Sequence, residues 1–89
     1  MLVSVEFLAQ AKVAAGEARC EVELADAATP RELLRQLVER RPTMAPLAGC
    51  NGEAVPLLLF VGNEQVDWDD GRPLRDGDRV LITSPMSGG

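Results

Sequence analysis

The sequence contains no histidine and no tyrosine, and these absences narrow the chemistry that the chain can carry. Its two cysteines, Cys20 and Cys50, lack the CxxC spacing of a zinc or redox site and are too few for a disulfide framework. Without histidine nothing completes a metal-binding set, so we expect no metal site. We also expect no independent enzyme, because the carboxylates show no pairing that suits acid–base catalysis.

The chain is also poor in positive charge and in long hydrophobic runs. Lysine and arginine together number 9 against 14 aspartate and glutamate residues, which gives a formal net charge of −5. Nucleic-acid binding needs clustered basic residues, so we expect no nucleic-acid partner. The longest apolar run, residues 57–61, is too short to span a membrane, and residues 2–8 lack the basic start and the length of a signal peptide. We expect no membrane association and a cytoplasmic protein.

What the chain does contain is the composition of an ordinary globular protein, with 46% hydrophobic and 26% charged residues. Its 89 residues fit one compact domain and leave no room for a second core. We predict a single domain over residues 1–83 and a flexible tail over residues 84–89. Any large substrate site must then be completed by another protein.

Two alternating segments in the first third of the chain predict strands. Val3, Val5 and Phe7 are apolar at every second position, which places them on one face, toward the core. The same alternation over residues 20–24 predicts a second strand with Cys20 in the core. Residues 9–16, between them, have the small side chains of a short helical turn or loop.

A helix start follows the second strand. Thr29 can cap the helix, Pro30 suits its first position, and Glu32 can complete a capping box. Apolar residues then recur at helical spacing until Pro42 prevents continuation: Leu33, Leu34, Leu37 and Val38. We therefore expect one side of this helix to pack on a sheet.

The second half of the sequence predicts a long loop and three strands. Residues 43–56 show no clear period and contain several prolines and glycines, which predicts an irregular connection. Strands are predicted over residues 57–61, 66–68 and 79–83, with a tight hairpin turn at 62–63 and a second turn at 75–78. The element order predicts an α+β fold with one main helix on one face of a mixed sheet.

The strand over residues 57–61 is apolar on both faces, although a single helix can cover only one face of the sheet. We hypothesise an exposed patch that binds partner enzymes, made by Leu58 and Phe60 together with Leu81. The alternate set Leu57, Leu59 and Val61 could be the exposed one instead, and burial of the surplus face under the 43–56 loop is a further alternative. Two tail residues, Pro85 and Met86, are added to the predicted partner-binding set.

The tail ends in Gly88-Gly89, after a Pro85 that cannot extend the ladder of the last strand. Two glycines carry no side chains, so an extended backbone can enter a narrow channel and bring the terminal carboxylate to a reactive centre of another protein. The plain alternative is a frayed end of small residues.

Several of these segments resemble one known family. They are similar to the MoaD and ThiS-like sulfur carriers. The similar segments are the opening strand over residues 3–7, the capped helix over residues 29–41, the hairpin over residues 60–68, residues 73–80 and the terminal residues 87–89. That family includes the small subunit of molybdopterin synthase. The resemblance covers nearly the whole chain and implies the ubiquitin-like β-grasp fold, with about five strands.

The resemblance also implies a sulfur carrier that works through partner enzymes. An E1-like adenylyltransferase, similar to MoeB or ThiF, would use ATP to adenylate the carboxylate of Gly89, and sulfur would then replace AMP to give a thiocarboxylate. Gly88 would give the tail its conformation, and a MoaE-like enzyme would accept the sulfur in molybdopterin synthesis. The ATP site is expected in the partner, because this chain has no glycine-rich phosphate loop, and no permanently bound cofactor is expected.

Other functions stay open at this point. Residues 82–86 have one proline and no aromatic, whereas many molybdopterin-synthase small subunits carry an aromatic residue and a Pro-Pro pair there. Similar carriers supply sulfur for thiamin, cysteine or transfer-RNA thiolation, and some are attached to lysines as protein modifiers. A ubiquitin-like binding module without sulfur chemistry is another possibility, as is a functional thiol at Cys50.

Overall fold

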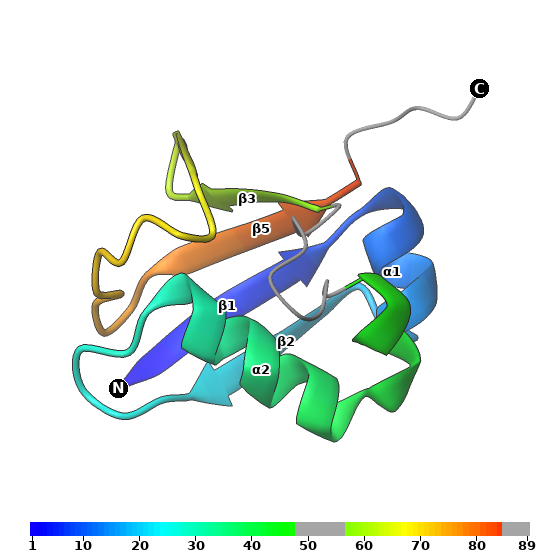
Figure 1. Ribbon diagram of the computed structural model, residues 1–89, viewed down its shortest axis with the longest axis horizontal. Helices are drawn as coiled ribbons and strands as arrows, with labels where there is room; N and C mark the ends of the chain where they lie inside the picture. The colour runs from blue at the N-terminus through cyan, green and yellow to red at the C-terminus, as the bar shows by residue number, and fades with distance from the viewer. Residues whose placement is uncertain (48–56, 85–89) are drawn as a thin grey trace.

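The computed structural model describes residues 1–47 and 57–84 and contains a five-stranded sheet with helices on one side (Figure 1). The elements in chain order are β1 (Leu2–Phe7), α1 (Ala9–Ala15), β2 (Arg19–Glu23), α2 (Pro30–Arg40), the 3₁₀ helix η1 (Pro42–Leu47), β3 (Leu58–Val61), β4 (Glu64–Val66) and β5 (Arg79–Thr83). The predicted sites at Cys50 and in the tail lie outside the described residues.

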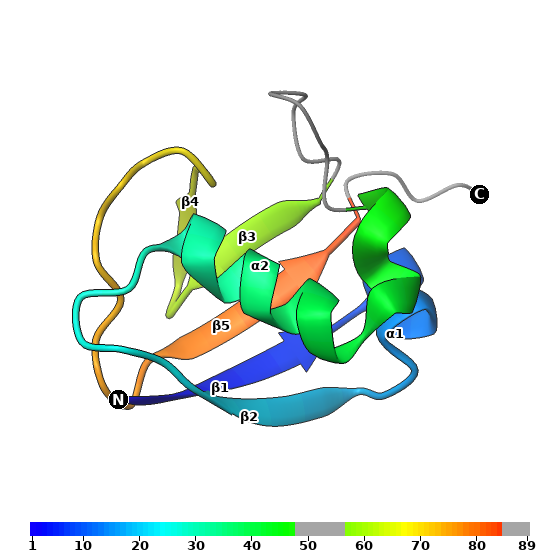
Figure 2. The ribbon, with the colours of Figure 1, turned by 60° about the horizontal axis from the view of Figure 1, so that its bottom comes forward.

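The strands lie in the order β2-β1-β5-β3-β4. The first and last strands, β1 and β5, pair in parallel at the centre, and every other pairing is antiparallel. Helix α2 lies across one face of this sheet, as Figure 2 shows from a second direction. The predicted α+β, β-grasp architecture is therefore confirmed.

Helix α2 forms as the sequence predicts. The side-chain oxygen of Thr29 accepts a hydrogen bond from the backbone N–H of Glu32 at 3.4 Å, and Pro30 occupies the first helical position. The carboxylate of Glu32 accepts from the hydroxyl of Thr29 at 3.4 Å, in place of the backbone N–H that a capping box uses. Leu33, Leu34 and Leu37 turn toward the sheet and are buried.

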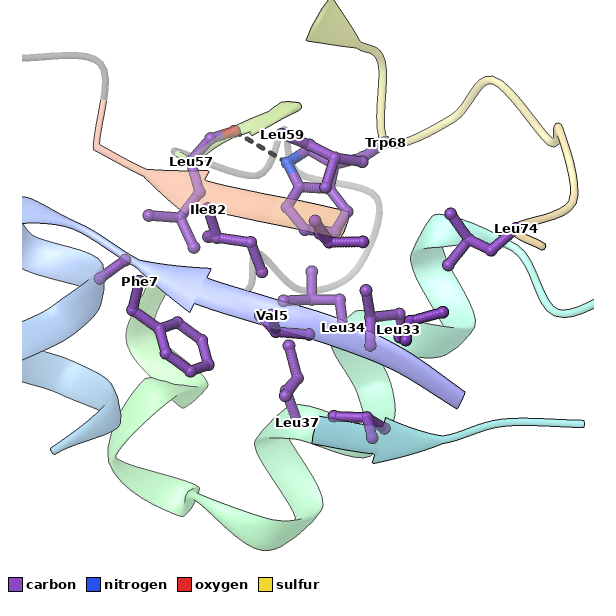
Figure 3. Close-up of a cluster of buried hydrophobic side chains, with 14 of the residues drawn as sticks. Val5, Phe7, Leu33, Leu34, Leu37, Leu57, Leu59, Trp68, Leu74 and Ile82 are labelled. Atoms are coloured by element: carbon purple, nitrogen blue, oxygen red, sulfur yellow. Dashed lines mark hydrogen bonds between the residues drawn. The ribbon is translucent and has the colours of Figure 1, made fainter. Parts of the chain in front are cut away.

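The core lies between α2 and the inner face of the sheet (Figure 3). Val5, Phe7, Leu59 and Ile82 from the sheet are almost completely buried, opposite the leucines of α2. The indole N–H of Trp68 donates to the carbonyl oxygen of Leu57 at 2.8 Å, which satisfies a buried polar group and closes this end of the core.

Three local predictions need correction. Residues 9–16 were expected as a short helical turn or loop, but residues 9–15 form a seven-residue α-helix that Gly16 caps, and the φ of +79° at Gly16 suits glycine. Residues 43–47 of the expected irregular loop belong to the helix η1. Strand β4 covers residues 64–66 and not 66–68, because the two-residue turn lets pairing resume at once, with Glu64 opposite Val61.

The turn after residue 74 fastens the start of β1 to β5. The carboxylate of Asp76 accepts a hydrogen bond from the backbone N–H of Leu2 at 2.7 Å, and the N–H of Gly77 donates to the carbonyl oxygen of Leu2 at 2.8 Å. The N–H of Ser4 donates to the carbonyl oxygen of Asp78 at 3.0 Å. These bonds extend the parallel pairing beyond the strand itself.

We expect Asp76→Ala to lower the free energy of unfolding by about 1 kcal/mol, because the N–H of Leu2 loses its acceptor. Asp76→Asn keeps an acceptor oxygen and should stay close to the parent protein. Urea unfolding, followed by the fluorescence of Trp68, measures both variants. Equal losses in the two variants would contradict this role of the side-chain oxygen.

Candidate functional site

The chain leaves the sheet at Ser84, at the end of the central strand β5, and this point is called the exit below. The start of α1 lies against it (Figure 1). The backbone N–H of Leu8 donates to the carbonyl oxygen of Ile82 at 2.9 Å, and the N–H of Gln10 donates to the hydroxyl oxygen of Ser84 at 3.4 Å. Ser84, the last described residue and the first of the predicted tail, is therefore held by the turn into α1.

The outer face of the sheet, opposite α2, is polar on one half and apolar on the other. One row of paired residues crosses it from β2 to β4: Arg19, Glu6, Leu81, Phe60 and Gln65. The change from charged to apolar side chains falls between β1 and β5. Farther along β1 and β2 the face stays polar, with Ser4 opposite Glu21.

The apolar half of this face adjoins the exit. Leu58, Phe60 and Leu81 are partly buried there, and Leu58 pairs with Thr83, the last residue of β5. Exposed Leu8 follows β1 directly and completes a group of four that we name the exit patch: Leu8, Leu58, Phe60 and Leu81.

The structure distinguishes the two predicted faces of β3. Leu57 and Leu59 are 3% and 1% exposed and belong to the core, while partly buried Val61 packs against it. The outward set is therefore Leu58 and Phe60. The part of the 43–56 segment that the structure describes, in η1, packs on α1 and α2, away from the outer face.

Sequence reasoning missed Leu8 as a surface residue. The signal was present, because the alternation that points Val3, Val5 and Phe7 inward places Leu8 with Ser4 and Glu6 on the outside. Val13 was also missed and is 74% exposed on α1. A helix of seven residues is too short for apolar periodicity to show which of its residues are buried and which are exposed.

The carboxylates near the turns serve the backbone. Asp67, Asp70 and Asp78 each accept a hydrogen bond from a backbone N–H two or three residues away, at 2.8 to 3.2 Å. Asp69 pairs with Arg31 at 2.8 Å. Among the residues that the structure describes, no group of three His, Cys, Asp or Glu side chains is placed to hold a metal ion.

Cys20 lies in a setting that suppresses thiol reactivity. It faces the core, as the sequence predicted, but is only partly buried and packs against the buried cluster. Burial raises the pKa of the Cys20 thiol, the nearby charge of Arg41 offsets part of this rise, and Glu17 adds to it. Arg41 itself forms an ion pair with Glu17 and lies over the ring of Phe7, 5.7 Å from its centroid. The thiol stays protonated at neutral pH and is a weak nucleophile there.

Two hollows of about 310 Å³ each lie elsewhere on the surface. One runs along α2 beside Leu24, and the other lies between the β3–β4 hairpin and residues 72–75. Neither is lined by α1 or β5, so neither adjoins the exit. In the described ranges no helix has the length and apolar content needed to cross a membrane.

The predicted tail residues cannot be placed in this geometry. Gly88, Gly89, Pro85 and Met86 lie outside the described residues. The division into a domain over residues 1–83 and a tail therefore stays a prediction, as do the roles of these four residues.

Comparisons with known proteins agree on the fold. The model of the ThiS family matches residues 5–89. A molybdopterin synthase sulfur carrier subunit from Chlamydomonas reinhardtii is 30% identical over 90 residues, with 100% of both chains covered.

Two solved structures show the same fold. SAMP1 from Haloferax volcanii has a TM-score of 0.85 with 23% identity, and 100% of both chains is covered. The complex of subunits 1 and 2 of the molybdopterin-converting factor from Helicobacter pylori contains a chain with a TM-score of 0.65 and 21% identity, again over 100% of both chains.

Matched substitutions on adjacent residues of β3 test which side of the strand is core. We expect Leu59→Ala to lower the free energy of unfolding by about 2–5 kcal/mol, because it leaves a cavity among buried side chains. Leu58→Ala removes the same atoms from the outer face and should cost roughly 1 kcal/mol or less. Urea unfolding measures both. Similar losses would show that the outer side of β3 contributes to the core as much as the inner side.

Proposed function

The chain belongs to the ThiS family, as its sequence resemblance predicted, and from this premise we propose that it is a sulfur carrier of the molybdopterin-synthase small-subunit type. The end-to-end similarity to the algal sulfur carrier subunit carries this proposal. The position of the exit supports it. A carrier must present its chain end to another protein, and β5 brings the chain to the surface beside an apolar patch.

We propose that the reacting group is the carboxylate of Gly89. A carboxylate repels nucleophiles, so a leaving group must be installed before sulfur can attack. One carboxylate oxygen attacks the α-phosphate of ATP and releases pyrophosphate. A sulfur nucleophile then attacks the carbonyl carbon, AMP leaves with that oxygen, and a thiocarboxylate remains. Gly88 lets the tail enter a narrow channel, because it adds no side chain.

Partner enzymes supply the catalysis in this proposal. The ATP site belongs to an E1-like adenylyltransferase similar to MoeB or ThiF, and a MoaE-like subunit takes the sulfur. The printed description of the Helicobacter pylori structure, a complex of subunits 1 and 2, supports a pairing of this kind. The chain is then a donor subunit and not an enzyme by itself, and a cytoplasmic location stays an expectation of the sequence.

The exit patch is the proposed docking surface, extended by Pro85 and Met86 of the tail. Leu81 lies in β5, the strand that ends at the exit, and Leu58 and Phe60 lie in the neighbouring strand β3, so a partner covering them also receives the tail. Burial of exposed apolar surface would stabilise such a complex. The charged half of the outer face, with Glu6 and Arg19, would form the rim.

A protein modifier is a second candidate, because SAMP1-type structures described as small archaeal modifier proteins share the fold closely. The same activation of Gly89 would then transfer the acyl group to a lysine amine, and no sulfur would remain. Thiamin, cysteine and transfer-RNA thiolation are the alternative sulfur destinations. Lysine conjugates seen by mass spectrometry would favour the modifier.

The carrier proposal predicts a sulfur atom at the terminus. The protein purified from its own host, or incubated with ATP, sulfide and the host's E1-like enzyme, should show one oxygen replaced by sulfur in its intact mass, on the fragment ending in Gly89. A chain lacking Gly88 and Gly89 is the control and should gain no sulfur. An unmodified full-length terminus after this incubation would favour a binding module.

The docking surface predicts a position-dependent effect of one added charge. Leu81→Asp places a carboxylate in the exit patch and should weaken binding to the E1-like enzyme by about tenfold or more, measured by calorimetry. Ser4→Asp adds the same charge to the same face on β1, outside the patch, and should bind like the parent. Trp68 fluorescence confirms that both variants are folded. Equal affinities in the two variants would rule out docking through the patch.

A further inference from the structure

The chain has a single lysine, Lys12, and every other basic side chain is an arginine. The difference between lysine and arginine decides whether a basic side chain can react with an activated carboxylate. A lysine amine in its free-base form attacks acyl groups, whereas a guanidinium keeps its proton in proteins and does not. Lys12 is therefore the one side chain of the sequence that could form an isopeptide bond with an activated Gly89.

The fold places Lys12 near the exit, on helix α1. Lys12 is exposed on α1, two residues after Gln10, whose backbone N–H donates to the hydroxyl oxygen of Ser84 at 3.4 Å. Two residues along a helix separate Cα atoms by about 5 Å. Lys12 thus lies on the helix that touches the base of the tail.

The backbone amine at the other end of the chain is placed differently. The amino group of Met1 donates to the carbonyl oxygen of Leu24 at 2.8 Å. Met1 also precedes β1, which runs parallel to β5, so it lies at the end of the sheet away from Ser84. The amino group of Met1 is therefore far from the exit and already engaged in a hydrogen bond.

The length of the tail allows its end to reach Lys12. Five residues follow Ser84, and a chain of five residues spans at most about 16–18 Å when extended. That length exceeds the separation of Ser84 from α1, and the flexible stem of lysine adds reach. Groups joined through a short stretch of chain meet at a high effective concentration, so capture within one chain is favoured over capture between chains.

A plain structural role for Lys12 also exists. Lys12 lies in the last turn of α1, where a positive charge interacts favourably with the helix dipole. An arginine would serve that role equally, so the two roles can be separated by Lys12→Arg, which keeps the charge and removes the nucleophile.

We propose that Lys12 captures the activated carbonyl of Gly89 of its own chain when no sulfur donor does so, and this rests on the proposed function. The free amine attacks the carbonyl carbon of the Gly89 adenylate, and a C–N bond forms. The C–O bond to AMP breaks, AMP leaves with the electron pair, and the amine nitrogen loses a proton to solvent. The product is an isopeptide loop without a free terminus, which takes the carrier out of use. Sulfur supply competes for the same adenylate.

The test uses the full chain, the E1-like enzyme of the host and ATP, without sulfide. Intact mass should show a product lighter by one water, and digestion should give a peptide that joins Lys12 to Gly89. Added sulfide should suppress this product and yield the thiocarboxylate. Lys12→Arg should form no such product, while its thiocarboxylate yield with sulfide matches that of the parent chain.

Three results would overturn the proposal. The first is a product lighter by one water that forms from Lys12→Arg as much as from the parent chain. The second is a covalent dimer in which Lys12 is joined to the Gly89 of another copy. The third is an unchanged mass of the parent chain without sulfide, although the same chain forms the thiocarboxylate when sulfide is added. Failure of the proposed function looks different, because the parent chain would then gain no sulfur and release no pyrophosphate from ATP.

Discussion

The parallel pairing of β1 with β5 is the constraint from which the other features of this protein follow. It joins the first and last strands at the centre of the sheet, and the turn containing Asp76 and Asp78 fastens it at the start of β1. Because the two strands run in the same direction, both end at one edge. The segment that continues β1, which begins α1, therefore meets the segment that continues β5, which is the tail. A hairpin pairing would have separated them.

The uneven outer face follows from the same arrangement. Helix α2 covers the inner face (Figure 2), so the apolar residues that point outward from β3 and β5 are only partly buried within the described fold. They lie beside the exit, whereas β1 and β2 carry charged residues there. In an ordinary sheet with one face exposed to water, the residues of each strand alternate between an apolar inner face and a polar outer face. The outer face here is polar on β1 and β2 but apolar on β3 and β5, and an apolar outer surface of this kind is suited to contact with another protein.

The sequence predicted the elements whose residues repeat and missed those that depend on distant contacts. Alternation in β1 and β2 and the capped start of α2 placed these elements within one or two residues. Periodicity could not choose between the two sides of β3, because both are apolar, and only pairing with Ile82 and Leu81 decides it. Helix η1 had no period to reveal it, since it is held by packing on α1 and α2. The expected roles of Gly88 and Gly89 were inferred from their position at the end of the sequence and from carboxylate chemistry, and both residues lie outside the described ranges.

A protein that carries an activated acyl group must be unreactive toward that group. The sulfur nucleophile brought by the partner is the intended acceptor, so water and nucleophiles of the carrier itself shorten the life of the intermediate. Among the described residues, the thiol of Cys20 is protonated and packed against the core, and turn carboxylates such as Asp67 and Asp76 are occupied by backbone N–H groups. The basic side chains are arginines apart from Lys12. Lys12 lies on α1, the helix whose first turn contacts Ser84, so under the proposed function it is the side chain that would compete with the sulfur donor.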